Sequence, residues 1–268
     1  HNIRKSINKI VDYKRTVGED IKPPVVVYKA KVKLDGTNAG IRVVMGEVVA
    51  QSRSRLITPE DDNYGFAAYV DSIKEMLVAV IGNTAQLTIF GEWCGAGIQK
   101  RCSVSKCKKM FVVFAIEFDG KKSRMSSPVA LEVLFSKLRG VGVHTLPWYG
   151  DSIVVDYGSQ ESIDSAVNKM CEAVADVEKC DPWVKENFGH EGLGEGLVYY
   201  PRVQPRGFLD EDFMFKAKGE EHKNVIQLKP VISDPEMVAN VDAFVVKFVT
   251  ENRLTQGLTE LGISDPST

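Results

Sequence analysis

The segment Lys33–Asn38, which reads Lys-Leu-Asp-Gly-Thr-Asn, holds the residues best suited to chemistry in this chain. It lies between two β-branched runs, 25–28 and 41–44, so the lysine is predicted to end a strand beside a glycine that lets the backbone turn. A lysine placed in this way can act as a nucleophile once it has lost a proton. So short a motif also occurs by chance, and its meaning depends on what the chain supplies downstream.

Four later segments place polar residues where a purely structural interpretation favours apolar ones: Gln51–Arg55, Gly91–Gly97, Glu195–Tyr199 and Phe215–Lys218. In the last of these, Lys216 and Lys218 share one face of a strand at a spacing of two. Charges on strands are costly unless they are paired or face a ligand. Lysines, an arginine and glutamates at strand ends therefore indicate one polar cleft, suited to an anion together with a divalent cation.

These segments, in this order, resemble the nucleotidyltransferase motifs of the covalent ligase and capping-enzyme superfamily. Lys33–Asn38 matches its KxDGxN motif I, and the other matches are motif III at Gly91-Glu92, motif IIIa at Phe111–Ile116, motif IV at Glu195-Gly196 and motif V at Lys216–Lys218. Within the superfamily, Thr37-Asn38 and the run 91–100 most resemble RNA ligases of the phage RNA ligase 2 type, which include the kinetoplastid editing ligases. The resemblance covers roughly residues 25–225, and five motifs in order are far more specific than a lone KxDG.

The resemblance implies an ATP-dependent RNA ligase that works in three steps. Lys33 attacks the α-phosphorus of ATP to form a lysyl–AMP phosphoramidate, AMP passes to an RNA 5′-phosphate, and a 3′-hydroxyl attacks that adenylated end. Mg²⁺, which Mn²⁺ could replace, would bridge phosphate oxygens and is expected to contact Glu195. Lys216, Lys218 and the metal would favour the neutral amine of Lys33 and stabilise charge on the α-phosphate.

Further roles follow from the family pattern. Glu92 is expected to hold a ribose hydroxyl, Asn38 and Arg53 to lie near the phosphate, Val32 and Leu34 to line the adenine pocket, and Phe114 to stack on adenine. Arg55 is the alternative to Arg53, since both follow a serine, and Phe111 is the alternative to Phe114. Three residues apart on a strand, the two rings face opposite sides, so only one of them can stack.

Composition limits the partners and the compartment. The 268-residue chain has a formal net charge of −2, so a polyanion must be held by a local patch. Five cations fall within ten residues, and we expect this segment, 100–109, to contact RNA: Lys100, Arg101, Lys106, Lys108 and Lys109. Five cysteines without a CxxC pair and scattered histidines argue against zinc. An odd cysteine count and no long apolar run favour a soluble, cytoplasmic protein.

Short β-branched or aromatic runs predict strands over residues 25–31, 40–45, 47–51, 86–91, 111–118, 196–200 and 213–217. Apolar residues at helical spacing predict helices over 66–80, 129–138 and 163–177. Hairpin-linked strands mixed with helices, without regular βαβ alternation, predict an α+β fold with antiparallel sheets flanked by helices. Together with the resemblance, this indicates the nucleotidyltransferase (ATP-grasp-like ligase) fold.

The end of the chain differs from the rest. Two prolines precede an apolar helical stripe that runs from Val238 to Phe248, so we place a boundary near residue 226. An adenylyltransferase domain would span 1–225, and 226–268 would be a helical segment, a shortened version of the small helical domain of phage-type ligases. If it is shortened, we expect adenylation of Lys33 to survive and RNA sealing to be impaired.

Three alternatives stay open at this point. DNA ligases and mRNA capping guanylyltransferases belong to the same superfamily, but both normally carry an OB-fold, and the tail lacks strand alternation. An inactive RNA-end-binding module of the same fold is the third, and the presence of every motif side chain argues against it.

Overall fold

The computed structural model describes residues 3–18, 22–82, 86–118, 124–203, 205 and 207–219. The boundary predicted near residue 226 and the helical segment predicted over 226–268 lie outside the described residues.

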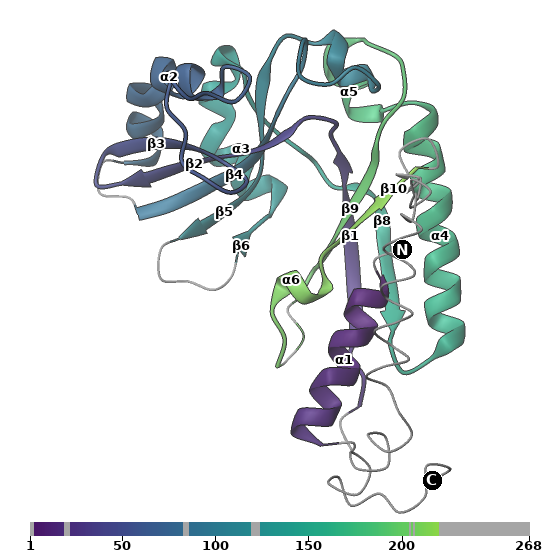
Figure 1. Cartoon of the computed structure of the whole chain (residues 1–268). Helices are drawn as coiled ribbons and strands as arrows, with labels where there is room; N and C mark the ends of the chain where they lie inside the picture. The colour runs from purple at the N-terminus through teal and green to yellow at the C-terminus, as the bar shows by residue number, and fades with distance from the viewer. Residues whose placement is uncertain are drawn as a thin grey trace, which may run out of the picture. The chain divides into compact units, whose positions relative to one another are not determined.

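The first sheet has four antiparallel strands in the order β10-β9-β1-β8. They are β1 (Val25–Lys33), β8 (Tyr149–Asp156), β9 (Gly196–Pro201) and β10 (Phe215–Lys218). Helix α4 (Gln160–Lys179) runs beside this sheet (Figure 1). Its buried side chains recur at helical spacing, as expected for a helix with one face on a core: Ile163, Ala166, Met170, Val174 and Val177.

The second sheet has the order β3-β2-β4-β5-β6, with antiparallel pairing, and β7 adds to β5 in parallel. Its strands are β2 (Thr37–Val44), β3 (Glu47–Ser52), β4 (Gln86–Cys94), β5 (Met110–Phe118), β6 (Arg124–Met125) and β7 (Val143–Thr145). Helices α2 (Phe66–Ile81) and α3 (Pro128–Phe135), with the 3₁₀ turn Ser136–Val141, pack their apolar side chains on this sheet. Phe66 anchors α2 because its ring lies 5.1 Å from that of Phe111.

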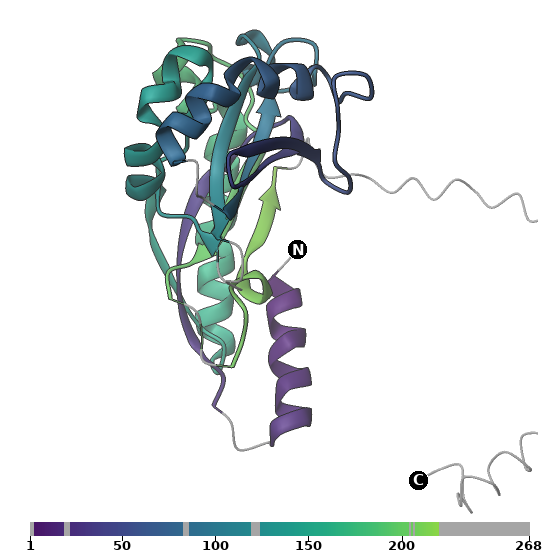
Figure 2. The same ribbon diagram turned by 90° about the vertical axis from the view of Figure 1, so that its left-hand side faces the viewer.

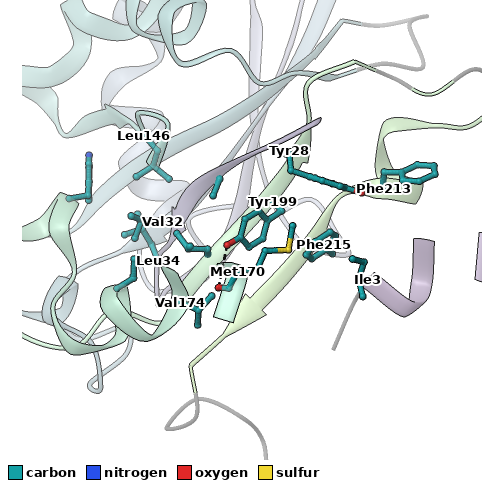
Figure 3. Close-up of a cluster of buried hydrophobic side chains, with 14 of the residues drawn as sticks. Ile3, Tyr28, Val32, Leu34, Leu146, Met170, Val174, Tyr199, Phe213 and Phe215 are labelled. Carbon is teal, nitrogen blue, oxygen red and sulfur yellow. Dashed lines mark hydrogen bonds between the residues drawn. The ribbon is translucent and has the colours of Figure 1, made fainter. Parts of the chain in front are cut away.

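The buried hydrophobic residues form two cores, and the first of them also takes in residues from β4 and β5 of the second sheet. The core under the first sheet joins β1, β9 and β10 to α4 (Figure 3). There the Tyr199 hydroxyl donates to the Met170 carbonyl at 3.4 Å, which ties β9 to α4. Since side chains alternate across a strand, residues on the other face of β1 are available for a site.

Three short or terminal helices complete the described structure. Helix α1 (Ile3–Val17) lies beside α6 (Asp210–Phe213) (Figures 1 and 2), where the Ser6 hydroxyl donates to the Asp212 carbonyl at 3.0 Å. Helix α5 (Pro182–Phe188) is capped by Asp181, whose carboxylate accepts from the first backbone N–H groups of the helix. Within the described residues, no helix combines the length and the apolar character needed to cross a membrane.

The predicted α+β fold with antiparallel sheets is confirmed, and the parallel β5–β7 pair is the exception to antiparallel pairing. Several predicted bounds differ from the structure by a few residues, and at two of them the kind of element changes as well. The third helix ends at Phe135 and tightens into a 3₁₀ turn, and Phe213 ends helix α6 instead of starting a strand. Strand β8 was not predicted, because it is largely exposed and has a Gly-Asp-Ser run near its start.

Candidate active site

The chain crosses from the first sheet to the second at the segment Lys33–Asn38. Lys33 is the last residue of β1 and Thr37 the first of β2. Gly36 is needed at this crossing because the backbone passes close to β4: a Cβ atom there would lie 2.5 Å from the Trp93 carbonyl oxygen. The nucleophile candidate therefore sits where the two sheets meet.

Glu195 is the hub of the charged residues at this junction. One carboxylate oxygen accepts a hydrogen bond from Lys33 Nζ, and the other lies 2.9 Å from Lys218 Nζ. The ladder makes this geometry, since Gly196 pairs with Lys33 on one side and with Lys218 on the other. Gly196 has φ 139°, and a Cβ atom there would overlap the Ala217 carbonyl oxygen, so a side chain is excluded at this position.

Several lysines lie on the face of the first sheet that points away from α4. On β1, Lys29, Lys31 and Lys33 recur at a spacing of two, and the register continues the last two rows to Lys216 and Lys218 on β10. Charges of one sign in adjacent rows repel, so this face favours an anionic ligand.

Glu92 and Asn38 bring the second sheet into the site. They are direct partners on the antiparallel strands β4 and β2, so they share a face. Burial raises the pKa of Glu92 to about 7; the Lys33 ammonium acts in the opposite direction, and the Glu195 carboxylate adds to the rise. Lys33 and Glu195 both act on the charge of the Glu92 carboxylate, so Glu92 lies near this ion pair.

Lys216 and Arg53 add positive charge to the same region. Burial lowers the pKa of Lys216, the Lys33 and Arg53 cations lower it further, and Glu92 and Glu195 raise it. Arg53 thus lies within electrostatic range of the site. Arg55, the alternative from sequence, forms a two-pronged ion pair with Asp61 at the surface, with one nitrogen–oxygen distance of 2.9 Å. Arg53 is thus close enough to Lys216 to act on its charge, whereas Arg55 is held by Asp61.

Phe114 and Phe111 occupy different environments. Phe111 is fully buried in the core of the second sheet. Phe114 is half-buried and is the extra residue of a β-bulge, since Gly91 pairs with Val113 and Phe90 with Ala115. Phe114 also lines a hollow of about 320 Å³ together with Tyr200. Of the two rings, Phe114 alone borders open space on the side that carries Glu92.

Lys31 is the residue at the site that sequence reasoning missed. Its side chain is 1% exposed, and its ammonium donates at 3.0 Å to the Phe114 carbonyl, which the bulge leaves out of the ladder. The ammonium also lies 5.1 Å from the ring centroid of Trp148 and 5.3 Å from that of Tyr200. Burial lowers the pKa of Lys31 to about 7. The available signal was the pattern of lysines at every second position of β1.

Val32 and Leu34 flank Lys33 in the chain, and their predicted role in lining the adenine pocket stays a prediction. Both side chains are buried in the core of the first sheet, near Met170 and Val174 of α4 (Figure 3). The physical reason is strand alternation, which turns Val32 away from its neighbour Lys33.

The carboxylates suit a metal ion that arrives with its own oxygen ligands. Within the described residues, no three Asp, Glu, His or Cys side chains are grouped so that they could hold a metal by themselves. Glu195 is nevertheless a nearly buried carboxylate beside two ammonium groups. Mg²⁺ commonly binds through one or two carboxylates and completes its shell with water and substrate phosphates, which fits this arrangement.

The basic segment 100–109 leaves β4 near the site and leads into β5. Its five cationic residues are exposed, and it includes the 3₁₀ turn Ser103–Lys106. Gly95 packs so closely on the Lys108 backbone that a Cβ atom there would lie 2.5 Å from its carbonyl oxygen. The segment is thereby held against the end of β4, two residues beyond Glu92.

Comparison with known families agrees with this architecture. The family model described as RNA ligase matches residues 27–218, a span that begins in β1 and ends at the last residue of β10. The chain belongs to the RNA ligase family.

Solved structures of Naegleria gruberi RNA ligase share the fold. A mutant of that enzyme with AMP and Mn aligns at a TM-score of 0.51 and 18% identity, over 83% of this chain and 55% of that chain. A mutant without ligand and one with ATP and Mn each align at 0.52, with the same identity and coverage. This chain therefore spans just over half of the length of the ligase it resembles.

Proposed function

We propose that this protein is an ATP-dependent RNA ligase of the RNA ligase 2 type, which carries AMP on Lys33. One observation carries the proposal most directly: the Glu195 carboxylate is shared by Lys33 and Lys218 at the meeting point of the two sheets. A lysine at a strand end is ordinary, but a nearly buried lysine with one carboxylate partner and further cations around it is typical of a functional site.

The first step is nucleophilic substitution at the α-phosphorus of ATP. Lys33 Nζ forms a phosphorus–nitrogen bond, the bond from the α-phosphorus to the bridging oxygen breaks, and pyrophosphate leaves with that electron pair. Nζ must lose a proton, and one of its protons is directed along the hydrogen bond to Glu195. Lys218 and Lys216 lie on the same face of the sheet and would stabilise the charge that develops on the phosphate.

A divalent cation bound with the nucleotide would supply further charge neutralisation at the phosphates. Glu195 is the residue we assign to hold it, directly or through water. The Naegleria gruberi ligase structures that contain ATP or AMP also contain Mn, which supports a nucleotide and metal pair in this fold.

The remaining side chains would position the nucleotide. Phe114 offers the ring on which adenine can stack, Glu92 would accept from a ribose hydroxyl, and Asn38 and Arg53 would contact the phosphate. Glu92 and Asn38 suit this work because they face the site from the second sheet while Lys33 reaches it from the first. A nucleotide bound in this way would bridge both sheets.

The later steps use RNA ends. AMP would pass from Lys33 to a 5′-phosphate, and a 3′-hydroxyl would displace AMP to form the phosphodiester bond. Both steps place negative charge at the same lysine-rich face, so one constellation serves all three.

The test is covalent labelling. The chain is incubated with ATP labelled at the α-phosphate and with Mg²⁺, and an acid-labile label on Lys33 is expected. Lys33→Ala should abolish the label. The matched control is Lys169→Ala, which removes an exposed lysine from α4 and should leave labelling unchanged.

Label on the unaltered chain with GTP and not with ATP would contradict the assignment as an RNA ligase. Label that persists in Lys33→Ala would contradict the assigned nucleophile.

A further inference from the structure

A second positively charged feature lies outside the Lys33 site. It is a surface groove of about 660 Å³, here called the basic groove, between the segment 106–110, the turn 139–144 and the end of α5. Its side chains include six with nitrogen at their tips: Lys106, Lys108, Lys109, Arg139, His144 and His190. No Asp or Glu is among the residues that line it in the described part of the chain.

The lysines of the basic groove are held in place without being neutralised. Lys106 Nζ donates to the Glu191 backbone carbonyl and Lys109 Nζ to the Tyr64 backbone carbonyl, each at 2.7 Å. A carbonyl orients an ammonium and leaves its charge and two further donors available. Lys108 is exposed to solvent.

Two carboxylates lie near the basic groove: one pairs with a cation of the groove, and the other pairs with a lysine outside it. Glu132 pairs with Arg139 and also accepts from the Thr145 hydroxyl. Glu191 pairs with Lys185 at 2.7 Å, although Lys106 also acts on it electrostatically. The groove therefore keeps a positive excess in a protein whose formal net charge is −2.

Aromatic rings form the other wall of the basic groove. His144 packs edge-on to Phe188 with centroids 5.3 Å apart, and His190 follows two residues later on the same rim. Burial and the Arg139 cation lower the pKa of His144, and the Glu132 carboxylate acts in the opposite direction. Cations beside flat rings are the combination that binds a nucleic-acid strand, because cations contact phosphates and rings stack on bases.

The basic groove adjoins the Lys33 site. Met110 lines the groove, and Val112, two residues along β5, pairs directly with Glu92. Two residues of a strand span about 7 Å. Measured along β5, the basic groove is therefore separated from the Lys33 site by no more than the length of a few nucleotides.

We propose that the basic groove binds the sugar–phosphate backbone of an RNA strand beside the junction that Lys33 acts on. This inference rests on the proposed function, since it assigns the partner of that same site. It adds a binding surface made from three separate segments, of which the sequence pointed only to the first.

The experiment measures binding of a 5′-phosphorylated RNA oligonucleotide to the whole chain by fluorescence anisotropy, over a series of salt concentrations. Lys108→Glu is expected to lower RNA affinity roughly three- to tenfold near 0.1 M salt and to reduce the slope of log K against log salt by about one. Lys108→Ala, a milder change at an exposed residue, should shift both quantities in the same direction by less.

Lys169→Glu is the matched control, because Lys169 is exposed on α4 and the variant makes the same change in net charge. It should leave both quantities unchanged. Labelling of Lys33 by ATP, measured without RNA, should be equal in all variants. The proposal for the basic groove would be overturned if Lys108→Glu and Lys108→Ala left RNA affinity and salt slope unchanged. It would also be overturned if the unaltered chain showed no measurable RNA binding.

The two proposals can fail separately. If the unaltered chain takes no label from ATP while Lys108→Glu still weakens RNA binding, the proposed function fails and the basic groove stands.

Discussion

Positive charge is concentrated in two regions of this protein, and the groups that contact the cations differ between them. At the Lys33 site the ammonium groups meet carboxylates, with Glu195 between Lys33 and Lys218. In the basic groove, Lys106 and Lys109 meet backbone carbonyls. The first arrangement lies in a protected junction between two sheets, and the second is exposed.

The difference teaches how location decides what a cation can do. A nearly buried charge must be compensated, so the Lys33 site carries its own anions and fixed geometry. An exposed charge is solvated, so the basic groove can leave cations open for a polyanion that exchanges with salt. We therefore expect changes at the first region to be large and geometric, and changes at the second to be modest and dependent on salt.

The largest expected difference between the two regions comes from removing a carboxylate from each of them. Glu195→Gln keeps the shape and removes the charge that Lys33 and Lys218 share, so we expect ATP labelling of Lys33 to fall by at least ~100-fold. Glu191→Gln is the matched change beside the basic groove, where the ion pair with Lys185 is exposed, and it should leave labelling within about twofold. Equal effects in the labelling assay would end the distinction.

A second comparison adds one methyl group to the backbone of each region. Gly36→Ala places a Cβ atom against the Trp93 carbonyl, so the crossing between the sheets must shift. We expect thermal unfolding to show a loss of about 1–3 kcal/mol and labelling to fall about tenfold. Gly140→Ala, in the basic groove, meets no atom within 4 Å and should be neutral in both measurements. A stable, fully active Gly36→Ala protein would contradict the close crossing.

The smallest expected effect concerns Lys31 and is read as a pH dependence. The folded state lowers the pKa of Lys31 from 10.5 to about 7, so the unfolded chain binds more protons between these values and stability rises with pH there. Lys31→Met removes the pH-dependent contribution of Lys31 to the free energy of unfolding. Its stability relative to the unaltered protein should therefore be greatest below about pH 7 and should decline towards pH 10.5.

Urea unfolding at several pH values would measure the Lys31 effect. Lys29→Met is the matched control, since Lys29 is half-buried on the same face of β1. A stability difference for Lys31→Met that is the same at every pH would show that Lys31 is not desolvated.

Sequence reasoning went furthest where a motif coincided with the end of a strand. Lys33, Glu195 and Lys218 could be placed together because strand ends and spacing predicted a common cleft, and the ladder brings all three to Gly196. Strand alternation turns Val32 away from Lys33, and the structure buries its side chain in a hydrophobic core.

Other features depend on contacts that no local pattern encodes. A lysine in a strand reads as exposed, so the burial of Lys31 could not be predicted without the bulge and the rings that cover it. The basic groove needs Arg139 and His144 beside Lys108, and these residues are far apart in the sequence. Long-range packing, and not residue type, decides such positions.

The bulge at Phe114 has one more consequence, which concerns insertion and deletion. Val113 pairs with Gly91 and Ala115 pairs with Phe90, which are consecutive residues of β4. Phe114 is therefore an extra residue without a partner in β4. Removing it would close the strand while every residue on either side kept its partner. A deletion of this one residue would therefore remove both the Phe114 ring and the carbonyl that accepts from Lys31. The strand pairing of the rest of β5 would be unchanged.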